Sequence, residues 1–262
     1  MATAPTLEPG LTRYRPSVGT THNIIGLDPL PPDVTHLALI DASIGETPAQ
    51  ENLERETAAE TTAFKASEGD IPPPPTDEAW RFDAVIVSGS QASVYEDREW
   101  IHELTAWARQ VHAGGIPTLG ICWGHQFLAQ ALGGRIVAMD EYELGYEQIT
   151  QAAESRLLAG LPAAFLAFET HSDRVYELPE GARLLAENDR GIQAFELGQT
   201  YGVQFHPEYD LETAEHVTRR KDLPEERIQA ALDGITAEAS EEAKEATAVF
   251  ENFEAIVENR RC

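Results

Sequence analysis

The sequence predicts an α/β protein with a mostly parallel sheet, helices on both faces and an additional β-rich segment. Short apolar runs alternate with amphipathic segments from Thr35 onward, glycines and prolines separate them, and residues 135–205 carry mainly strand patterns. In open sheets of this kind, ligands bind beyond the carboxyl ends of the strands. Polar residues that directly follow the apolar runs are therefore the first candidates for a functional site.

The predicted elements follow one another in a regular order. The apolar run His36–Ile40 predicts a first buried strand. Four consecutive prolines from Pro72 predict a rigid surface connection. The remaining predicted elements are a helix over 52–64, a strand from Phe82, a helix over about 98–112, a strand over 116–121, a helix over 123–132, the β-rich stretch over 135–205 and a mostly helical stretch over 211–261.

The length of 262 residues predicts one large domain, which we place at residues 35–262. Residues 1–34 are rich in Pro, Gly and Thr without sustained periodicity, so we interpret them as an irregular N-terminal extension. The chain carries neither a P-loop pattern nor a G-x-G-x-x-G pattern after a strand. We therefore expect no nucleotide cofactor, and any synthetase chemistry would need a separate subunit.

The chain is strongly acidic, with 45 Asp and Glu against 19 Lys and Arg and a net charge of −26. This charge argues against a nucleic-acid partner. Only three of the basic residues are lysines, and the acidic residues are spread along the chain. Such a surface suits high salt, where screening removes the repulsion, so we predict a high-salt cytoplasm. The alternative is an ordinary acidic protein with a disordered tail.

Cysteine content and apolar runs indicate a cytoplasmic setting. The two cysteines, Cys122 and Cys262, provide no disulfide framework, as is usual in a reducing compartment. The N-terminus lacks the apolar region of a signal peptide, and no run approaches about 18 apolar residues. We therefore expect neither secretion nor a membrane partner.

Cys122 lies at the junction of a predicted strand and a predicted helix, within Gly120-Ile121-Cys122-Trp123-Gly124. This is the pattern of a nucleophile elbow with sulfur in place of oxygen, in which the glycines relieve crowding around a sharp turn. The N-terminus of the following helix favours a thiolate and holds an oxyanion. The alternative is a buried structural cysteine that happens to lie between glycines.

A candidate partner for Cys122 is found at the end of a later apolar run, in His206-Pro207-Glu208. Residues two apart in an extended segment share a face, so His206 and Glu208 project together. A carboxylate beside an imidazole fixes its tautomer and stabilises the imidazolium, which leaves the other nitrogen for a thiol proton. His-Pro-Glu alone would more simply be a surface loop; together with Cys122 it predicts a catalytic triad.

These motifs, in this order, make the chain resemble the class I glutamine amidotransferase domain, from about residue 36 to 258. The resemblance implies a flavodoxin-like amidotransferase fold, with Cys122 as the nucleophile that attacks the glutamine carboxamide, His206 as general base and Glu208 as its partner. It also implies that ammonia and glutamate are released through a γ-glutamyl thioester. From the missing nucleotide-binding motifs we expect no cofactor.

The resemblance also implies further site residues. The strand that runs into Ser88-Gly89-Ser90 corresponds to the turn that supplies an oxyanion-hole amide, from Gly89, with the amide of Trp123 as the second donor. Thr170-His171-Ser172-Asp173 matches a pair whose backbone grips the amino-acid end of glutamine; from sequence alone it equally fits a polar strand end. The implied substrate-binding residues are Ser90, Gln126, His171, Ser172 and Asp173.

One departure from the family leaves the function open. Many amidotransferases attached to biosynthetic enzymes carry Gly-Gly-Pro at the oxyanion turn, whereas this chain has Gly89-Ser90-Gln91. That turn is similar to the branch with stand-alone GMP-synthase-like proteins and γ-glutamyl peptidases. The leading prediction is a glutaminase or amidotransferase acting on glutamine, with or without a separate synthetase subunit. The alternatives are a γ-glutamyl peptidase and an idle glutamine-binding module.

The acidic run Asp140-Glu141-Tyr142-Glu143 is the one other candidate for a ligand site. Carboxylates bind cations, but those without ligand-like spacing in so acidic a chain are usually solvated, and we interpret this run as solvated. No Cys and His set has the spacing of a zinc site. We therefore predict no metal.

Overall fold

A mixed sheet organises the structure, a computed structural model that describes residues 34–45 and 47–261. Among these residues nine strands form one sheet in the order β2-β1-β3-β4-β9-β8-β7-β5-β6. The predicted extension over residues 1–34 lies, apart from Val34, outside the described residues. The strands are β1 (His36–Asp41), β2 (Glu60–Lys65), β3 (Ala84–Val87), β4 (Thr118–Ile121), β5 (Arg135–Gln151), β6 (Ala164–Glu177), β7 (Arg183–Asn188), β8 (Gly191–Leu197) and β9 (Thr200–Val203).

The first half of the sheet is parallel. β2, β1, β3, β4 and β9 are paired in this order, and every pairing among them is parallel. All residues of β1, β3, β4 and β9 are buried. Strands buried on both faces lack polar alternation, which is why they are recognisable as short, continuous apolar runs.

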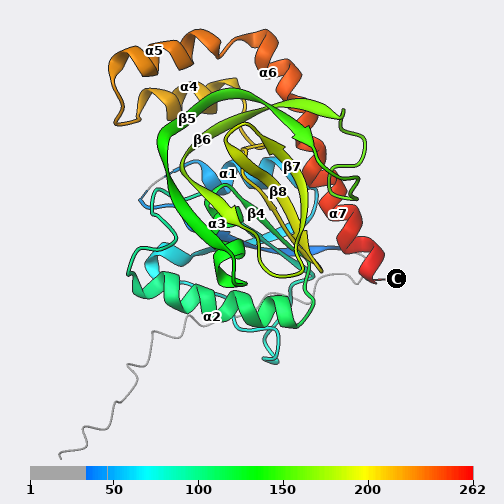
Figure 1. The fold of residues 1–262 in the computed structure, drawn as a ribbon. Helices are drawn as coiled ribbons and strands as arrows, with labels where there is room; N and C mark the ends of the chain where they lie inside the picture. The colour runs from blue at the N-terminus through cyan, green and yellow to red at the C-terminus, as the bar shows by residue number, and fades with distance from the viewer. Residues whose placement is uncertain (1–33, 46, 262) are drawn as a thin grey trace, which may run out of the picture. The chain divides into compact units, whose positions relative to one another are not determined.

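Helices cover both faces of the parallel strands, as Figure 1 shows. Alternate residues of β1 separate the two cores: Leu37 and Leu39 pack with residues of α1 and α7, whereas Ala38 and Ile40 pack with residues of α2 and α3. These helices are α1 (Ala49–Glu56), α2 (Glu99–Ala113), α3 (Trp123–Ala131) and α7 (Ala248–Arg261). The predicted fold class is confirmed.

The second half of the sheet is the predicted β-rich segment, and it is antiparallel throughout. β5 and β6 form a long curved hairpin (Figure 1), with a break in register between Ala138 and Glu143 of β5. An apolar cluster around Phe168, Ala214 and Ile235 joins this hairpin to the late helices. The remaining helical elements are α4 (Leu211–Arg219), α5 (Glu225–Gly234), α6 (Ala237–Ala243) and the 3₁₀ segments η1 (Ala66–Glu68) and η2 (Lys244–Thr247).

The predicted helix over 52–64 is wrong in its second half. α1 ends at Glu56, and residues 60–65 form β2, which pairs in parallel with β1 at the edge of the sheet. Adjacent threonines, Thr61 and Thr62, are β-branched and favour an extended backbone over a helix. The pairing with β1 reinforces that local preference.

The carboxyl ends of the central strands β3, β4 and β9 meet at one edge of the sheet, because the three strands are parallel and β4 lies between the other two. Gly89, Cys122 and His206 follow these strands within a few residues. No helix within residues 34–45 and 47–261 is long and apolar enough to cross a membrane.

Candidate active site

Cys122 occupies the turn between β4 and α3 in a strained backbone conformation. Its φ and ψ angles are 53° and −103°, and it is the only non-glycine with positive φ among the described residues. Its amide donates to the carbonyl of Val203 at 2.8 Å, and its carbonyl accepts from the amide of Gln126 at 3.1 Å. Conformations of this kind cost about 1–3 kcal/mol and persist where the surroundings impose them, most often at functional sites.

The two glycines that flank Cys122 allow α3 to pack directly against the sheet. A Cβ atom on Gly120 would lie 2.4 Å from the carbonyl carbon of Gly124, and one on Gly124 would lie 2.3 Å from the carbonyl oxygen of Val87. Neither glycine has a positive φ. Their role is therefore close packing between backbones, which relieves crowding as the sequence pattern predicted.

His206 and Glu208 form a buried pair beyond β9. Nδ1 of His206 lies 2.8 Å from Oε1 of Glu208, and both side chains are about 5% exposed. The His206 amide donates to the carbonyl of Phe168 at 2.8 Å, and its ring stacks on Tyr209. Burial alone would lower the pKa of His206, but the Glu208 carboxylate and the Cys122 sulfur raise it to about 10.

Gly89, Cys122 and His206 lie together at this edge of the sheet. A Cβ atom on Gly89 would lie 3.1 Å from Cε1 of His206 and 3.8 Å from Cβ of Cys122. The preceding Ser88 is anchored, since its Oγ accepts from the Ala42 amide at 3.0 Å. Trp123 opens α3, and the first amides of a helix have no partner within the helix.

The other predicted site residues have different surroundings. The Gln126 amide nitrogen donates to the Asp173 carbonyl at 2.8 Å and to Oε1 of Gln204 at 3.0 Å, so both of its protons are used within the protein. The Asp173 carboxylate accepts from the hydroxyls of Ser93 and Tyr95. Ser90 Oγ accepts from the amide of Ala92, whereas Ser172 is exposed.

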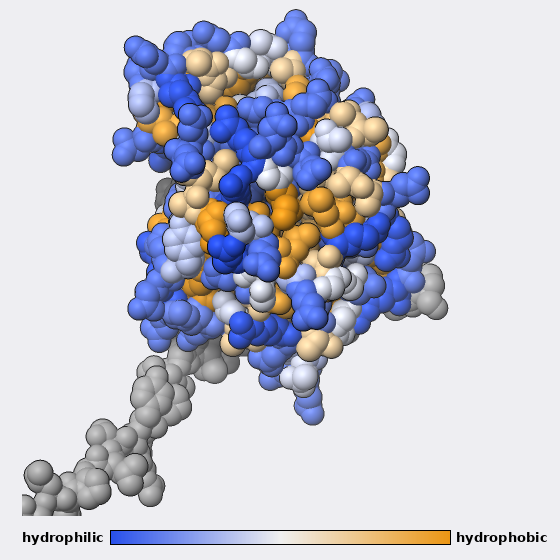
Figure 2. All heavy atoms as spheres, in the orientation of Figure 1, coloured by the Kyte–Doolittle hydropathy of each residue, from blue (hydrophilic) through white to orange (hydrophobic). Residues whose placement is uncertain are grey.

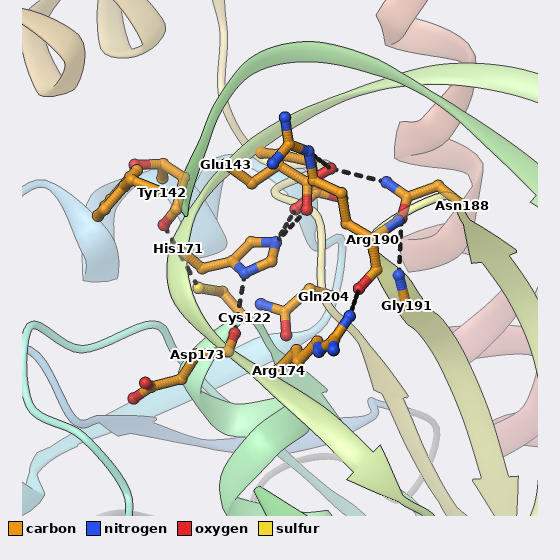
Figure 3. A network of polar contacts seen from close by, with 12 residues as sticks. Cys122, Tyr142, Glu143, His171, Asp173, Arg174, Asn188, Arg190, Gly191 and Gln204 are labelled. Carbon is orange, nitrogen blue, oxygen red and sulfur yellow. Dashed lines mark hydrogen bonds and ion pairs between the residues drawn. The ribbon is translucent and has the colours of Figure 1, made fainter. Parts of the chain in front are cut away.

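The His171 side chain joins two buried glutamates that the sequence analysis did not place in the site. Nε2 of His171 lies 3.0 Å from Oε2 of Glu143 (Figure 3). The same nitrogen lies 3.1 Å from Oε2 of Glu169. Burial opposes a charge on His171, but both carboxylates raise its pKa well above the usual value. Burial also raises the pKa of Glu169 to about 7.

The interpretation of 140–143 as a solvated acidic run is wrong for Glu143, which is 1% exposed. A strand places residues two apart on one face, so the alternation Glu169-x-His171-x-Asp173 was the available signal for a polar face on β6. The contribution of Glu143 comes from the neighbouring strand and depends on the β5–β6 register.

A cysteine at a strand-to-helix turn, with a buried His–Glu pair against it at the carboxyl edge of a parallel sheet, defines an α/β protein with a nucleophile-elbow architecture. The sequence profile of the family described as "Glutamine amidotransferase class-I" matches residues 39–223. The chain belongs to the class I glutamine amidotransferase family, which confirms the predicted resemblance.

Similar sequences include proteins named GMP synthase [glutamine-hydrolyzing]. The Thermomicrobium roseum protein is 38% identical over 125 residues, which cover 47% of this chain and 23% of that protein. The Staphylococcus aureus protein is 38% identical over 127 residues, which cover 47% of this chain and 24% of that protein. The matched region thus spans about a quarter of the length of these relatives.

Solved structures share the fold at lower sequence identity. A Thermotoga maritima glutamine amidotransferase superposes with a TM-score of 0.70 at 20% identity, covering 84% of this chain and 97% of that chain. A glutamine amidotransferase from Methylobacillus flagellatus gives a TM-score of 0.66 at 20% identity, covering 84% of this chain and 95% of that chain. At 20% sequence identity, this structural similarity shows that the fold is shared and carries no conclusion about function.

Proposed function

We propose that this protein hydrolyses the side-chain amide of glutamine, with Cys122 as the nucleophile. The observation that carries the proposal is the strained Cys122 at the elbow with the buried His206–Glu208 pair beside it. Family membership supplies the substrate class, because the matching family is named for glutamine amide transfer.

The first half of the proposed reaction forms a thioester. The pKa of His206, raised to about 10, makes its imidazole a strong base, which takes the thiol proton of Cys122 as the sulfur attacks. The thiolate attacks the γ-carbonyl carbon, and the C–O π electrons move to oxygen, where the amides of Gly89 and Trp123 stabilise the oxyanion. As the carbonyl re-forms, the C–N bond breaks, and His206 gives its proton to the departing nitrogen, which leaves as ammonia.

The second half of the reaction regenerates the enzyme. His206, now neutral, takes a proton from water as the hydroxyl oxygen bonds to the thioester carbon. Collapse of this second oxyanion breaks the C–S bond and releases glutamate. The products are one glutamate and one ammonia for each glutamine and water. Glu208 holds Nδ1 of His206, which keeps Nε2 directed at the reacting atoms and stabilises the imidazolium.

We further propose that Ser90, Gln126, His171, Ser172 and Asp173 form the glutamine pocket. The contacts of Gln126 with Asp173 and Gln204 give it a positioning role, since it ties α3 to β6 and to the segment before His206. Exposure leaves Ser172 available for direct contact with substrate.

The acceptor of the nitrogen is a separate question. The relatives named GMP synthase [glutamine-hydrolyzing] support delivery of the ammonia to a synthetase partner. The Ser88-Gly89-Ser90 turn favours the alternative of a γ-glutamyl peptidase that uses the same three residues. In both cases the bond broken is at a γ-glutamyl carbonyl.

We also propose that the protein works in the cytoplasm at high salt and does not bind nucleic acid. The support is compositional: a net charge of −26 with very few lysines. Hydrophilic residues cover much of the face in Figure 2, over the late helices in particular, and apolar residues gather toward its middle.

One assay tests the proposal. Glutamate release from glutamine and from γ-glutamyl dipeptides is measured in molar KCl for wild type, Cys122→Ala and Cys262→Ala. We expect Cys122→Ala to abolish release and Cys262→Ala, which changes the other cysteine of the chain, to retain it. Preference for glutamine supports the amidotransferase, and preference for dipeptides supports the peptidase. Absence of Cys122-dependent release from either substrate would favour the idle glutamine-binding module.

A further inference from the structure

Three buried side chains next to the proposed triad form a cluster that the proposed reaction does not use. We call Glu143, Glu169 and His171 the Glu–Glu–His cluster. Their side chains are at most 3% exposed, and one ligand-type atom from each lies within 4.8 Å of the others. Glu143 comes from β5, and the other two residues come from one face of β6.

The contacts of the His171 ring determine which nitrogen faces the carboxylates. Nδ1 lies 2.9 Å from the carbonyl oxygen of Asp173, which only accepts, so Nδ1 carries a proton. Nε2 points toward Glu143 (Figure 3), yet neither carboxylate is aligned for a hydrogen bond with it. A histidine that gives one N–H to a backbone carbonyl and directs the other nitrogen at carboxylates has the arrangement of a metal ligand.

The charges of the cluster also point to a cation. Both oxygens of Glu169 and Oε2 of Glu143 are buried without a hydrogen-bond donor. The other oxygen of Glu143 accepts from Asn188 at 2.7 Å and lies 3.7 Å from the guanidinium of Arg190. Buried carboxylates with so few partners are costly. One divalent cation that displaces the Nε2 proton of His171 would neutralise both carboxylates.

We propose that the Glu–Glu–His cluster binds one divalent cation of the class that takes mixed imidazole and carboxylate ligands, such as Zn²⁺ or Mn²⁺. The spacing lies closest to octahedral coordination, as taken by Mn²⁺. Two ligand atoms each about 2.1 Å from one ion lie about 3.0 Å apart at a right angle and about 3.4 Å apart at the tetrahedral angle that zinc prefers. The distances from Nε2 to the two carboxylates are 3.0 and 3.1 Å. The sequence analysis predicted no metal. It could not foresee this site, because only the pairing of β5 with β6 brings Glu143 and Glu169 together.

The cation has a positioning role. It holds β5 to β6 where the β5 register breaks, between Ala138 and Glu143. Thr170, between two ligands, places its carbonyl oxygen 3.9 Å from the Cys122 sulfur. A cavity of about 520 Å³, lined by Glu143, Glu147 and Arg190 among others, lies beside the cluster.

Metal binding is tested in the full chain carrying Cys122→Ser, which removes the thiolate as a competing ligand and makes the result independent of the proposed hydrolysis. After chelator treatment, ZnCl₂ and, separately, MnCl₂ are titrated by calorimetry, and bound metal is measured after dialysis. We expect one ion per chain for at least one metal. Glu169→Gln should weaken that binding at least about 10-fold, whereas the control Glu212→Gln, on the exposed face of α4, should leave it unchanged.

Thermal unfolding gives a second readout. A metal that binds only the folded chain raises its Tm, so ZnCl₂ or MnCl₂ should raise the Tm of the parent by more than that of Glu169→Gln. Glu143→Gln should behave in the same way. This second variant keeps the test decisive if Glu169→Gln folds poorly. Failure of both metals to bind the parent, or equal affinity of the parent and both glutamine variants, would overturn the proposal.

Discussion

At the scale of single residues, the pKa of His206 sets the pH range of the proposed reaction. Glu208 and Cys122 raise this pKa to about 10 against the effect of burial. The proton that His206 gives to ammonia is lost as the pH rises through that value. We therefore expect kcat/KM for glutamine to fall on the alkaline side.

Glu208→Gln should move this alkaline limb toward lower pH by about one to three units, because it removes the charge that stabilises the imidazolium. The measurement is the pH profile of kcat/KM. Glu212→Gln, an exposed glutamate on α4, is the control and should keep the wild-type profile. An alkaline limb that is the same in Glu208→Gln and wild type would contradict the role of Glu208.

Gly89→Ala tests the position of the oxyanion turn. The added Cβ would lie 3.1 Å from Cε1 of His206, so the turn or the ring must shift by a few tenths of an ångström. Because a misplaced oxyanion donor weakens transition-state binding more than substrate binding, kcat should fall by roughly 100-fold or more while KM changes little. Gly114→Ala, whose Cβ would meet its neighbours at 3.4 Å or more, should leave kcat unchanged.

At the scale of elements, the α3 elbow depends on close packing as much as on chemistry. Gly124→Ala would place a Cβ atom 2.3 Å from the backbone oxygen of Val87. Since backbone cannot rotate away, we expect a loss of about 1–3 kcal/mol or more in the free energy of unfolding. This corresponds to a fall in Tm of about 2–4 °C per kcal/mol.

Differential scanning calorimetry measures this loss. The matched control is Gly234→Ala at the end of α5, where an added Cβ would meet nothing within 4 Å. The control should have an unchanged or slightly higher Tm. If the two variants had equal Tm values, close packing at the elbow would not be the reason why position 124 is a glycine.

The sequence predicted those elements that can be recognised from a few adjacent residues. Strands such as β3 and β4, buried on both faces, are continuous apolar runs, and the elbow and the His206–Glu208 pair are short motifs. β2 was missed because an edge strand beside a short helix has only two β-branched threonines to mark it. Glu143 was misplaced because its burial depends on pairing with β6, which no local pattern encodes.

At the scale of the whole molecule, charge repulsion should make stability depend on salt. With a net charge of −26, acidic side chains repel one another over the Debye length, about 10 Å at 0.1 M and about 3 Å at 1 M salt. The unfolded chain spreads the same charge over a larger volume, so screening favours the folded state. We expect Tm to rise by several degrees between 0.1 M and 1 M KCl.

The shape of the salt dependence separates screening from general salting-out. Screening is nearly complete at about 1 M, so most of the rise should occur below that concentration and be the same in NaCl and KCl. A variant with Glu225→Gln and Glu226→Gln, both exposed at the start of α5, should show a smaller rise, because it carries less charge to screen. A Tm that is flat up to 1 M, or that rises only above it, would contradict charge repulsion as the cause and remove the support for a high-salt setting.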